Sequence, residues 1–327
     1  MADLRTKYMG LELSSPVIAA SSGQTATVDK VKKLADAGAG AVVLKSLFEE
    51  QILFDSKKMT EGFNAGVYTD AYDYFNGMSS NFFLDEYLGL VEDCKKAVDI
   101  PIIASVNCVS DGAWIKYAER FQNVGADALE LNVFKLPVDK RMESSDYEDL
   151  YYNVAKEIKS AVSIPVALKL SPHFTSLARV LQELADLDID ALVLFNRFYR
   201  PDIDIQKLRM SHSPVLSASE EISLSLQWIA LLSGEIEVDF AATTGSHDSS
   251  GVIKQLLAGA KAVQLCTAIY KEGAGVITKI NKEIEDWMES KNFKTVSEFN
   301  GMLCQEESEH PEVYERTQYM KASVGIN

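Results

Sequence analysis

The sequence predicts a single (β/α)8 TIM barrel, an α/β fold, and three observations indicate this class. Eight short apolar segments alternate with segments of helical periodicity along most of the 327 residues. The apolar segments contain few alternating polar residues, which is typical of parallel strands covered on both faces. The chain is long enough, since such a barrel takes about 250 residues before insertions. We therefore expect one domain over residues 1–327, with a C-terminal extension at 293–327.

The expected strands share a recurrent way of beginning. Four follow a helix end that runs into Gly or Asp and then Ala, and two begin at Pro101 and Pro165. A glycine suits the left-handed residue that ends a helix, and a proline is tolerated at the first residue of a strand. The segments between the strands are amphipathic, as at 28–37. The strands are expected at residues 16–20, 41–44, 101–106, 128–131, 165–168, 191–195, 236–242 and 262–265.

Loop insertions follow strands 2, 4 and 6, at residues 47–84, 133–146 and 197–217. Each leaves the C-terminal end of its strand, the side on which barrel enzymes build their sites, and loops of this length are usually functional. The alternative architecture is an open doubly wound sheet. No Gly-x-Gly-x-x-Gly follows the first strand, however, and Gly38-Ala39-Gly40 precedes a strand instead.

Composition and charge exclude several classes of function. The chain has 32 Lys and Arg against 48 Asp and Glu, so its net charge of −16 disfavours nucleic acid and anionic membranes as partners. No run of 18 apolar residues could form a transmembrane helix, and the first ten residues contain no apolar signal core. The 4 cysteines form no Cys-x-x-Cys pair, which indicates reduced thiols in a cytoplasmic protein. The 4 histidines lack the spacing of a zinc site, so no metal is expected.

Polar residues end all eight expected strands. Any one of them could cap a helix or a turn. Together they favour a polar ligand, because the strands of a barrel all end at the same rim. These residues are Ser21, Ser22, Lys45, Ser46, Ser105, Asn107, Asn132, Lys169, Asn196, Thr243, Thr244, Cys266 and Thr267.

Lys45 and Lys169 are the most informative of these residues, because each directly follows a buried apolar run. A buried lysine needs an anionic or acceptor partner. Two ammonium groups in one cavity would repel each other unless an anionic ligand lay between them. The alternative is an ion pair with Glu130, whose strand is expected to face the same way.

The last two strands end in a candidate phosphate site. Thr244, Gly245 and Ser246 follow strand seven, and Cys266 and Thr267 follow strand eight. Barrel phosphate sites form at this position from backbone N–H groups and helix N-termini. A phosphate site and two lysines suit flavin mononucleotide (FMN), because a lysine stabilises the negative charge of a reduced flavin ring.

These residues resemble the dihydroorotate dehydrogenase family over nearly the whole chain, from Met9 to Leu303. The matching motifs are Ala20-Ser21-Ser22-Gly23, Lys45-Ser46, Asn132, Lys169 in Lys-Leu-Ser-Pro, Asn196, Gly245 and the segment 264–273. Asn76 lies in a fainter match to the family's substrate loop. The resemblance implies an FMN-dependent flavoprotein of pyrimidine biosynthesis, an oxidoreductase that oxidises dihydroorotate to orotate by hydride transfer to flavin N5, or acts on a related cyclic substrate.

The resemblance also implies roles for individual residues. The substrate is expected at Asn76, Asn132 and Asn196, with Lys135, Asn132 and Lys45 as catalytic candidates. A homodimer is expected, and an iron–sulfur partner subunit stays open. Apolar residues of the tail could contribute to the dimer, although core packing explains them equally well (Phe293, Phe299, Met302, Leu303, Tyr314 and Tyr319). The expected cofactor residues are Ala20, Ser21, Lys45, Ser46, Asn107, Asn132, Lys169, Thr244, Gly245, Ser246, Cys266 and Thr267.

Lys135 marks the main departure from the family pattern, because it stands where the soluble class carries a Cys or Ser general base. A lysine with a pKa of about 10.4 is a poor base unless it is strongly desolvated. It could otherwise act as an acid, anchor a carboxylate or face solvent. Two further alternatives are a Schiff-base lyase or aldolase with Lys169 as nucleophile, and a flavin-binding relative without dihydroorotate activity.

Overall fold

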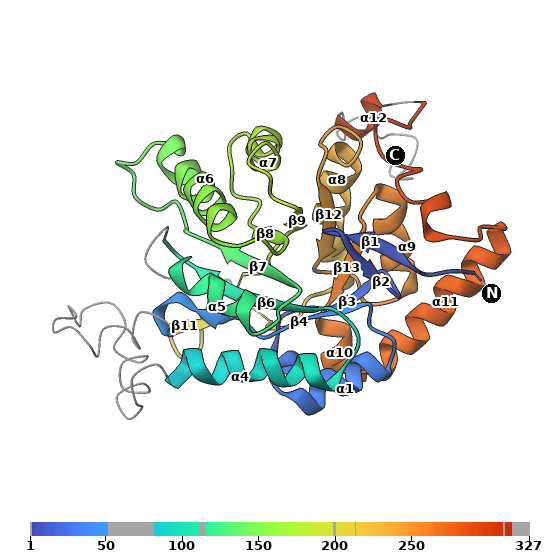
Figure 1. The fold of residues 1–327 in the computed structure, drawn as a ribbon. Helices are drawn as coiled ribbons and strands as arrows, with labels where there is room; N and C mark the ends of the chain where they lie inside the picture. Colours follow the sequence, from blue (N-terminus) through green and yellow to red (C-terminus); the bar gives the residue numbers. More distant parts are fainter. Residues whose placement is uncertain are drawn as a thin grey trace.

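The computed structural model describes residues 2–51, 82–110, 115–198, 201–212, 214–309 and 311–315, and it contains a closed barrel of eight parallel strands (Figure 1). Neighbouring strands pair in the order β4-β3-β13-β12-β9-β8-β7-β6, and a pairing between β4 and β6 closes the ring. The short strand β5 (Leu47–Phe48) also pairs with β6. The barrel strands are β3 (Val17–Ala19), β4 (Ala41–Val43), β6 (Ile102–Cys108), β7 (Ala128–Val133), β8 (Val166–Leu170), β9 (Ala191–Leu194), β12 (Asp239–Thr243) and β13 (Ala262–Leu265).

A helix follows each barrel strand and packs outside it, which confirms the predicted alternation (Figure 1). In α7, Leu177, Val180, Leu181 and Leu184 are buried at helical spacing and form the face turned toward the barrel. The helices in chain order are α1 (Val28–Asp36), α4 (Phe82–Ala97), α5 (Ala118–Asn123), α6 (Ser144–Ala161), α7 (Leu177–Ala185), α8 (Ile222–Leu232), α9 (Ser249–Ala258), α10 (Thr267–Glu272), α11 (Gly275–Lys291) and α12 (Glu312–Glu315).

The predicted strands are confirmed, with an end shifted by two residues or more at four of them. The strand expected from residue 236 begins at Asp239, because residues 235–238 form a turn after α8. Conversely, β6, β7 and β8 run two residues further than expected, to Cys108, Val133 and Leu170. Asn107 and Asn132 therefore belong to strands and are paired in register with each other, which fixes their positions more firmly than a loop would.

An antiparallel hairpin of β1 (Thr6–Tyr8) and β2 (Leu11–Leu13) closes the N-terminal end of the barrel. Tyr8, Met9 and Leu13 form one buried cluster with residues at the strand starts, among them six alanines. The small alanine side chains leave room for the larger hairpin side chains. With this end filled, a ligand reaches the barrel interior at the C-terminal end of the strands.

The insertions and the tail add smaller elements. Residues 197–217 contain the exposed hairpin of β10 (Pro201–Asp204) and β11 (Arg209–His212). Four short 3-10 helices complete the described elements: η1 (Gly23–Thr25), η2 (Ile115–Tyr117), η3 (Ser219–Glu221) and η4 (Val296–Glu298). Within the described ranges, no helix is both long enough and apolar enough to cross a membrane.

The tail packs on the body of the protein through aromatic residues. Phe299 is fully buried and lies 5.0 Å, centroid to centroid, from the ring of Trp287 on α11. Phe293 completes this cluster. Met302 and Leu303, in contrast, are 49% and 56% exposed, and Tyr319 lies outside the described residues. Core packing therefore explains the most buried of these side chains, and the homodimer stays a prediction.

Candidate functional site

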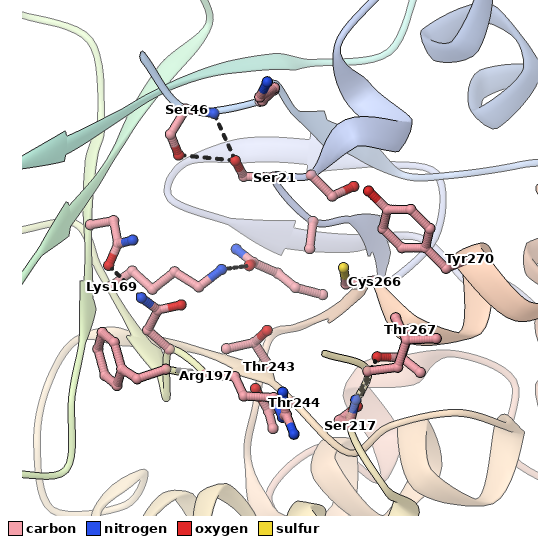
Figure 2. Close-up of a pocket in the computed structure, with 18 of the residues that line it drawn as sticks. Ser21, Ser46, Lys169, Arg197, Ser217, Thr243, Thr244, Cys266, Thr267 and Tyr270 are labelled. Atoms are coloured by element: carbon pink, nitrogen blue, oxygen red, sulfur yellow. Dashed lines mark hydrogen bonds between the residues drawn. The ribbon is translucent and has the colours of Figure 1, made fainter. Parts of the chain in front are cut away.

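The C-terminal ends of the strands surround a cavity of about 680 Å³, which we call the rim cavity (Figure 2). Polar side chains from different strands converge on it, as the strand endings predicted. Of the site residues expected from the sequence, those that line it are Ala20, Ser21, Lys45, Ser46, Asn107, Asn132, Lys169, Asn196, Thr244, Gly245, Ser246, Cys266 and Thr267.

Three serines connect the ends of β3, β4 and β6. The Ser21 and Ser46 hydroxyls lie 3.0 Å apart, and the Ser46 backbone N–H donates to Ser21 Oγ at 2.9 Å (Figure 2). Ser46 Oγ in turn lies 2.8 Å from Ser105 Oγ. This chain fixes the loop that carries Lys45. Lys45 lines the rim cavity but is exposed, so the burial expected for this lysine from the apolar run before it is wrong.

Lys169 is 7% exposed and reaches into the rim cavity from β8 (Figure 2). Its Nζ donates to Gln264 Oε1 at 2.8 Å and lies 3.5 Å from Glu130 Oε1. Gln264 Nε2 donates to the other Glu130 oxygen, so the three side chains form a closed polar network. The pair with Glu130 that the sequence left open is therefore present, and Lys169 lines the cavity as well. Since an ammonium group has three N–H donors, one is left for a ligand.

Two asparagines and two aromatic rings lie on the β7 and β9 side of the cavity. Asn196 Nδ2 donates to Asn132 Oδ1 at 2.9 Å, which leaves the Asn132 amide N–H groups and the Asn196 carbonyl for other partners. Next to them the rings of Phe134 and Phe198 stack with centroids 3.8 Å apart. Both rings line the cavity, and neither belongs to the polar residues expected at the strand ends.

The loops after β12 and β13 form a second polar region, which we call the anion corner: Thr244, Gly245, Ser246, Cys266 and Thr267. Thr244 and Gly245 have positive φ angles of 73° and 83°. A Cβ on Gly245 would lie 2.1 Å from the Ile222 backbone nitrogen, so glycine is required there. Ser246 Oγ is buried without a hydrogen-bond partner in the described structure, and its residue lines the cavity. Burial raises the pKa of the Cys266 thiol, which keeps it neutral at pH 7.

Lys135 and Asn76 are the two predicted site residues not found in the rim cavity. The Lys135 side chain is exposed and is absent from the cavity lining. Its Nζ lies 5.7 Å from the centroid of the Tyr147 ring, so its contact is a cation–π interaction with α6. Asn76 lies outside the described residues.

Other lining residues were not among the site residues expected from the sequence. They are Phe48, Leu216, Ser217, His247 and Tyr270. Ser217 and His247 are separated by 30 residues, so only the fold brings them together. Within the described part of the chain, no group of His, Cys, Asp and Glu side chains could hold a metal ion, which leaves the cavity without a metal candidate there.

Comparison with known proteins identifies the family. The family model for dihydroorotate dehydrogenase matches residues 3–288. The chain belongs to this family. It is 28% identical over 315 residues to the dihydroorotate dehydrogenase B (NAD(+)) catalytic subunit of Methanocaldococcus jannaschii, covering 91% of this chain and 97% of that protein. The corresponding protein of Thermoplasma volcanium is also 28% identical, with 92% and 99% coverage.

A plant relative extends the comparison to another reaction. The chloroplastic dihydropyrimidine dehydrogenase (NADP(+)) of Arabidopsis thaliana is 24% identical over 341 residues, covering 96% of this chain and 80% of that protein. The chain is thus an oxidoreductase that acts on CH–CH bonds, as predicted, in a family that is generally flavin-dependent.

Proposed function

We propose that this protein is an FMN-dependent oxidoreductase that oxidises a cyclic substrate in the rim cavity. One observation supports the proposal: two lysines, a pair of hydrogen-bonded asparagines and the anion corner all line the same cavity. Each group alone has a structural explanation. Their convergence from six different strand ends matches the needs of a ligand with an anionic group at one end and a polar ring at the other.

The residues of the cavity fit the chemistry of FMN. Ser246 Oγ is a buried hydroxyl with no described partner, so a phosphate oxygen would supply the missing hydrogen bond. Gly245 adopts the positive φ of the turn at this corner, and its missing side chain leaves room for the Ile222 backbone. We assign the phosphate to the anion corner and the ring to a set of residues on the opposite side: Ala20, Ser21, Lys45, Ser46, Asn107, Asn132 and Lys169. A bound FMN would supply the hydride acceptor for the oxidation.

Lys169 supplies fixed positive charge in the cavity interior. Gln264 and Glu130 hold its Nζ in one position, so little reorganisation is needed when negative charge develops nearby. Asn132 and Asn196 hold each other's side chains, and their remaining amide groups can orient a substrate that carries both donors and acceptors.

Two candidate substrates follow from the family, namely dihydroorotate and a related cyclic compound. Dihydroorotate oxidation requires a base that removes a proton from carbon, and Lys135 offers no such group to the cavity because its amine lies over Tyr147. The stacked Phe134 and Phe198 rings instead offer an apolar surface beside the two asparagines. These two observations favour a related cyclic substrate with an apolar face over dihydroorotate.

Anaerobic flavin bleaching tests the proposal. Purified protein is expected to carry FMN, and its flavin absorption is expected to fall when the true substrate is added under argon. A panel containing dihydroorotate and cyclic compounds with larger apolar faces would separate the two candidates. Protein that takes up no FMN would contradict the proposal, and borohydride trapping of a carbonyl substrate on Lys169 would support a Schiff-base enzyme instead.

We also propose a protein partner that accepts electrons from the bound flavin. The support is the name of the archaeal relatives, which describes a catalytic subunit. Light scattering on the purified chain tests the predicted homodimer. Co-purification of a second, redox-active polypeptide with the tagged chain from its own cells tests the partner, and efficient turnover by the chain alone with NAD(+) would contradict it.

A further inference from the structure

Three side chains at the anion corner form a connected row, and the proposed function uses only one of them, Thr267. Ser217 Oγ lies 2.8 Å from His247 Nε2 and donates to Thr267 Oγ1 at 2.9 Å. The Ser217 backbone N–H also donates to Thr267 Oγ1, at 3.1 Å. All three residues line the rim cavity, and Figure 2 shows Ser217 and Thr267 side by side at its lower edge. Ser217 and Thr267 are 6% and 7% exposed, so the row is largely shielded from water.

The donors in this row point in one direction. The single proton of the Ser217 hydroxyl is used toward Thr267, so His247 Nε2 must donate to Ser217 Oγ. Thr267 Oγ1 accepts twice from Ser217, which leaves its own proton free. Because Thr267 belongs to the anion corner, this proton is available to an anion in the cavity, and so is the orphaned hydroxyl of Ser246.

We propose that His247 and Ser217 are positioning residues for the cofactor phosphate, acting through the hydroxyl of Thr267. The inference rests on the proposed function, since it assigns the bound group a phosphate monoester. The imidazole of His247 is the first of three donors in the row, followed by the hydroxyls of Ser217 and Thr267. In such a chain, each hydrogen bond polarises the next donor and strengthens the bond that it makes. Protonation occurs at Nδ1, which has no hydrogen-bond partner within the described residues, so the direction of the row is kept in both charge states.

Charged groups from three neighbouring segments act on His247. Burial is the main cause that lowers the pKa of His247, and Lys271 on α10 adds to it. Asp248, next in the chain, and Glu220 and Glu221 on η3 act in the opposite direction, although Arg197 neutralises Glu221 at 2.8 Å. The free protein therefore holds His247 neutral at pH 7. A bound dianion would favour the imidazolium form, so the cofactor is held more tightly as the pH falls toward about 6.

The rate of flavin release from the full chain tests this inference. The chain is loaded with FMN or with riboflavin, which lacks the phosphate, and release is followed by the fluorescence of the free flavin. Ser217→Ala breaks the row and is expected to speed FMN release about tenfold, while riboflavin release stays within about twofold. Equal acceleration for both flavins would mean that Ser217 only packs the loop, and would overturn the proposal.

The variant His247→Gln tests the contribution of the positive charge on the His247 side chain. A glutamine amide can still donate to Ser217 but cannot become cationic, so FMN release near pH 8 is expected to stay close to that of the unchanged protein. The slowing of release that the unchanged protein shows between about pH 8 and pH 6 should be lost. Identical pH profiles for the two proteins would overturn the role of His247. Absence of FMN binding in the unchanged protein would overturn the proposed function itself, and this inference with it.

Discussion

At the scale of single residues, the buried network of Lys169, Glu130 and Gln264 combines a structural and a chemical role. Removing one member of a buried ion pair leaves the other charge without a partner, which costs about 3 kcal/mol or more. We therefore expect Glu130→Gln to lower the free energy of unfolding in urea by about this amount. The double variant Glu130→Gln/Lys169→Met removes both charges and is expected to recover most of the loss. A single variant as stable as the unchanged protein would show that Lys169 does not depend on Glu130.

Gly245 shows how a single position restricts the anion corner. Its φ is 83°, and an added Cβ would lie only 2.1 Å from the Ile222 nitrogen. We therefore expect Gly245→Ala to destabilise the protein by about 3 kcal/mol, from backbone strain and overlap together. Gly10 has a φ of 76° with nothing within 4 Å of such a Cβ, so Gly10→Ala isolates the backbone strain, about 1 kcal/mol. Equal losses in thermal unfolding would contradict the role of the Ile222 contact.

Residue-scale patterns in the sequence predicted the members of the site but not every contact. Of the 13 polar residues expected at strand ends, 12 line the rim cavity, because parallel strands bring their C-terminal ends to one rim. Lys135 was placed by its spacing from Asn132, yet the direction of its side chain depends on Tyr147 of α6, which spacing does not encode. His247 and Ser217 carried no signal because loops distant in sequence bring them together.

At the scale of elements, the repeated Asp-Ala joints found in the sequence have a structural cause. Asp127 precedes β7 and accepts from the Ile102 backbone N–H of β6, while Asp190 precedes β9 and accepts from the Val166 backbone N–H of β8. Each aspartate also pairs with a lysine of a helix, at 2.7 Å in both cases. The motif thus connects a strand start, the neighbouring strand and a helix, and its periodicity in the sequence reflects the β/α repeat.

The two bonds of Asp190 predict a graded effect of substitution. Asp190→Asn keeps an acceptor for Val166 and loses the partly exposed pair with Lys159, a loss of about 0.5 kcal/mol. Asp190→Ala also leaves the Val166 N–H without its acceptor, and about 2 kcal/mol should be lost. Urea unfolding of both variants measures the difference. If alanine and asparagine cost the same, the strand-to-strand bond contributes nothing to stability.

At the scale of the whole molecule, the barrel has one closed end and one open end. The hairpin β1–β2 fills the N-terminal end, and the rim cavity occupies the other. The eight-strand pattern predicted the barrel because the strands are apolar on both faces. The closing role of the β1–β2 hairpin is harder to predict, since its three-residue strands are too short for a periodicity argument. That the hairpin closes the barrel is seen only in its packing against the alanines of the strand starts.

Asp239 connects the β1–β2 hairpin to the barrel and makes the free energy of unfolding depend on pH. Its carboxylate accepts from the Met9 backbone N–H at 2.7 Å, yet burial raises the pKa of Asp239 above its usual value, an effect only partly offset by that bond. A raised pKa in the folded state means that this group stabilises the fold most when protonated, and that the contribution is lost as the pH rises through the folded-state pKa. At pH 7 the charged group therefore weakens the closed end of the barrel.

Asp239→Asn removes this charge and keeps an oxygen that can accept from Met9. We expect the variant to be more stable than the unchanged protein at pH 7, and the difference in unfolding free energy to shrink as the pH is lowered below about 4, where the aspartate becomes protonated in both states. Asp190→Asn serves as the control, because its pair with Lys159 predicts a loss of stability at pH 7 instead. Denaturant unfolding across this pH range measures both. A variant at position 239 that is less stable at pH 7 would show that the Met9 bond and the nearby lysines outweigh the burial of the carboxylate.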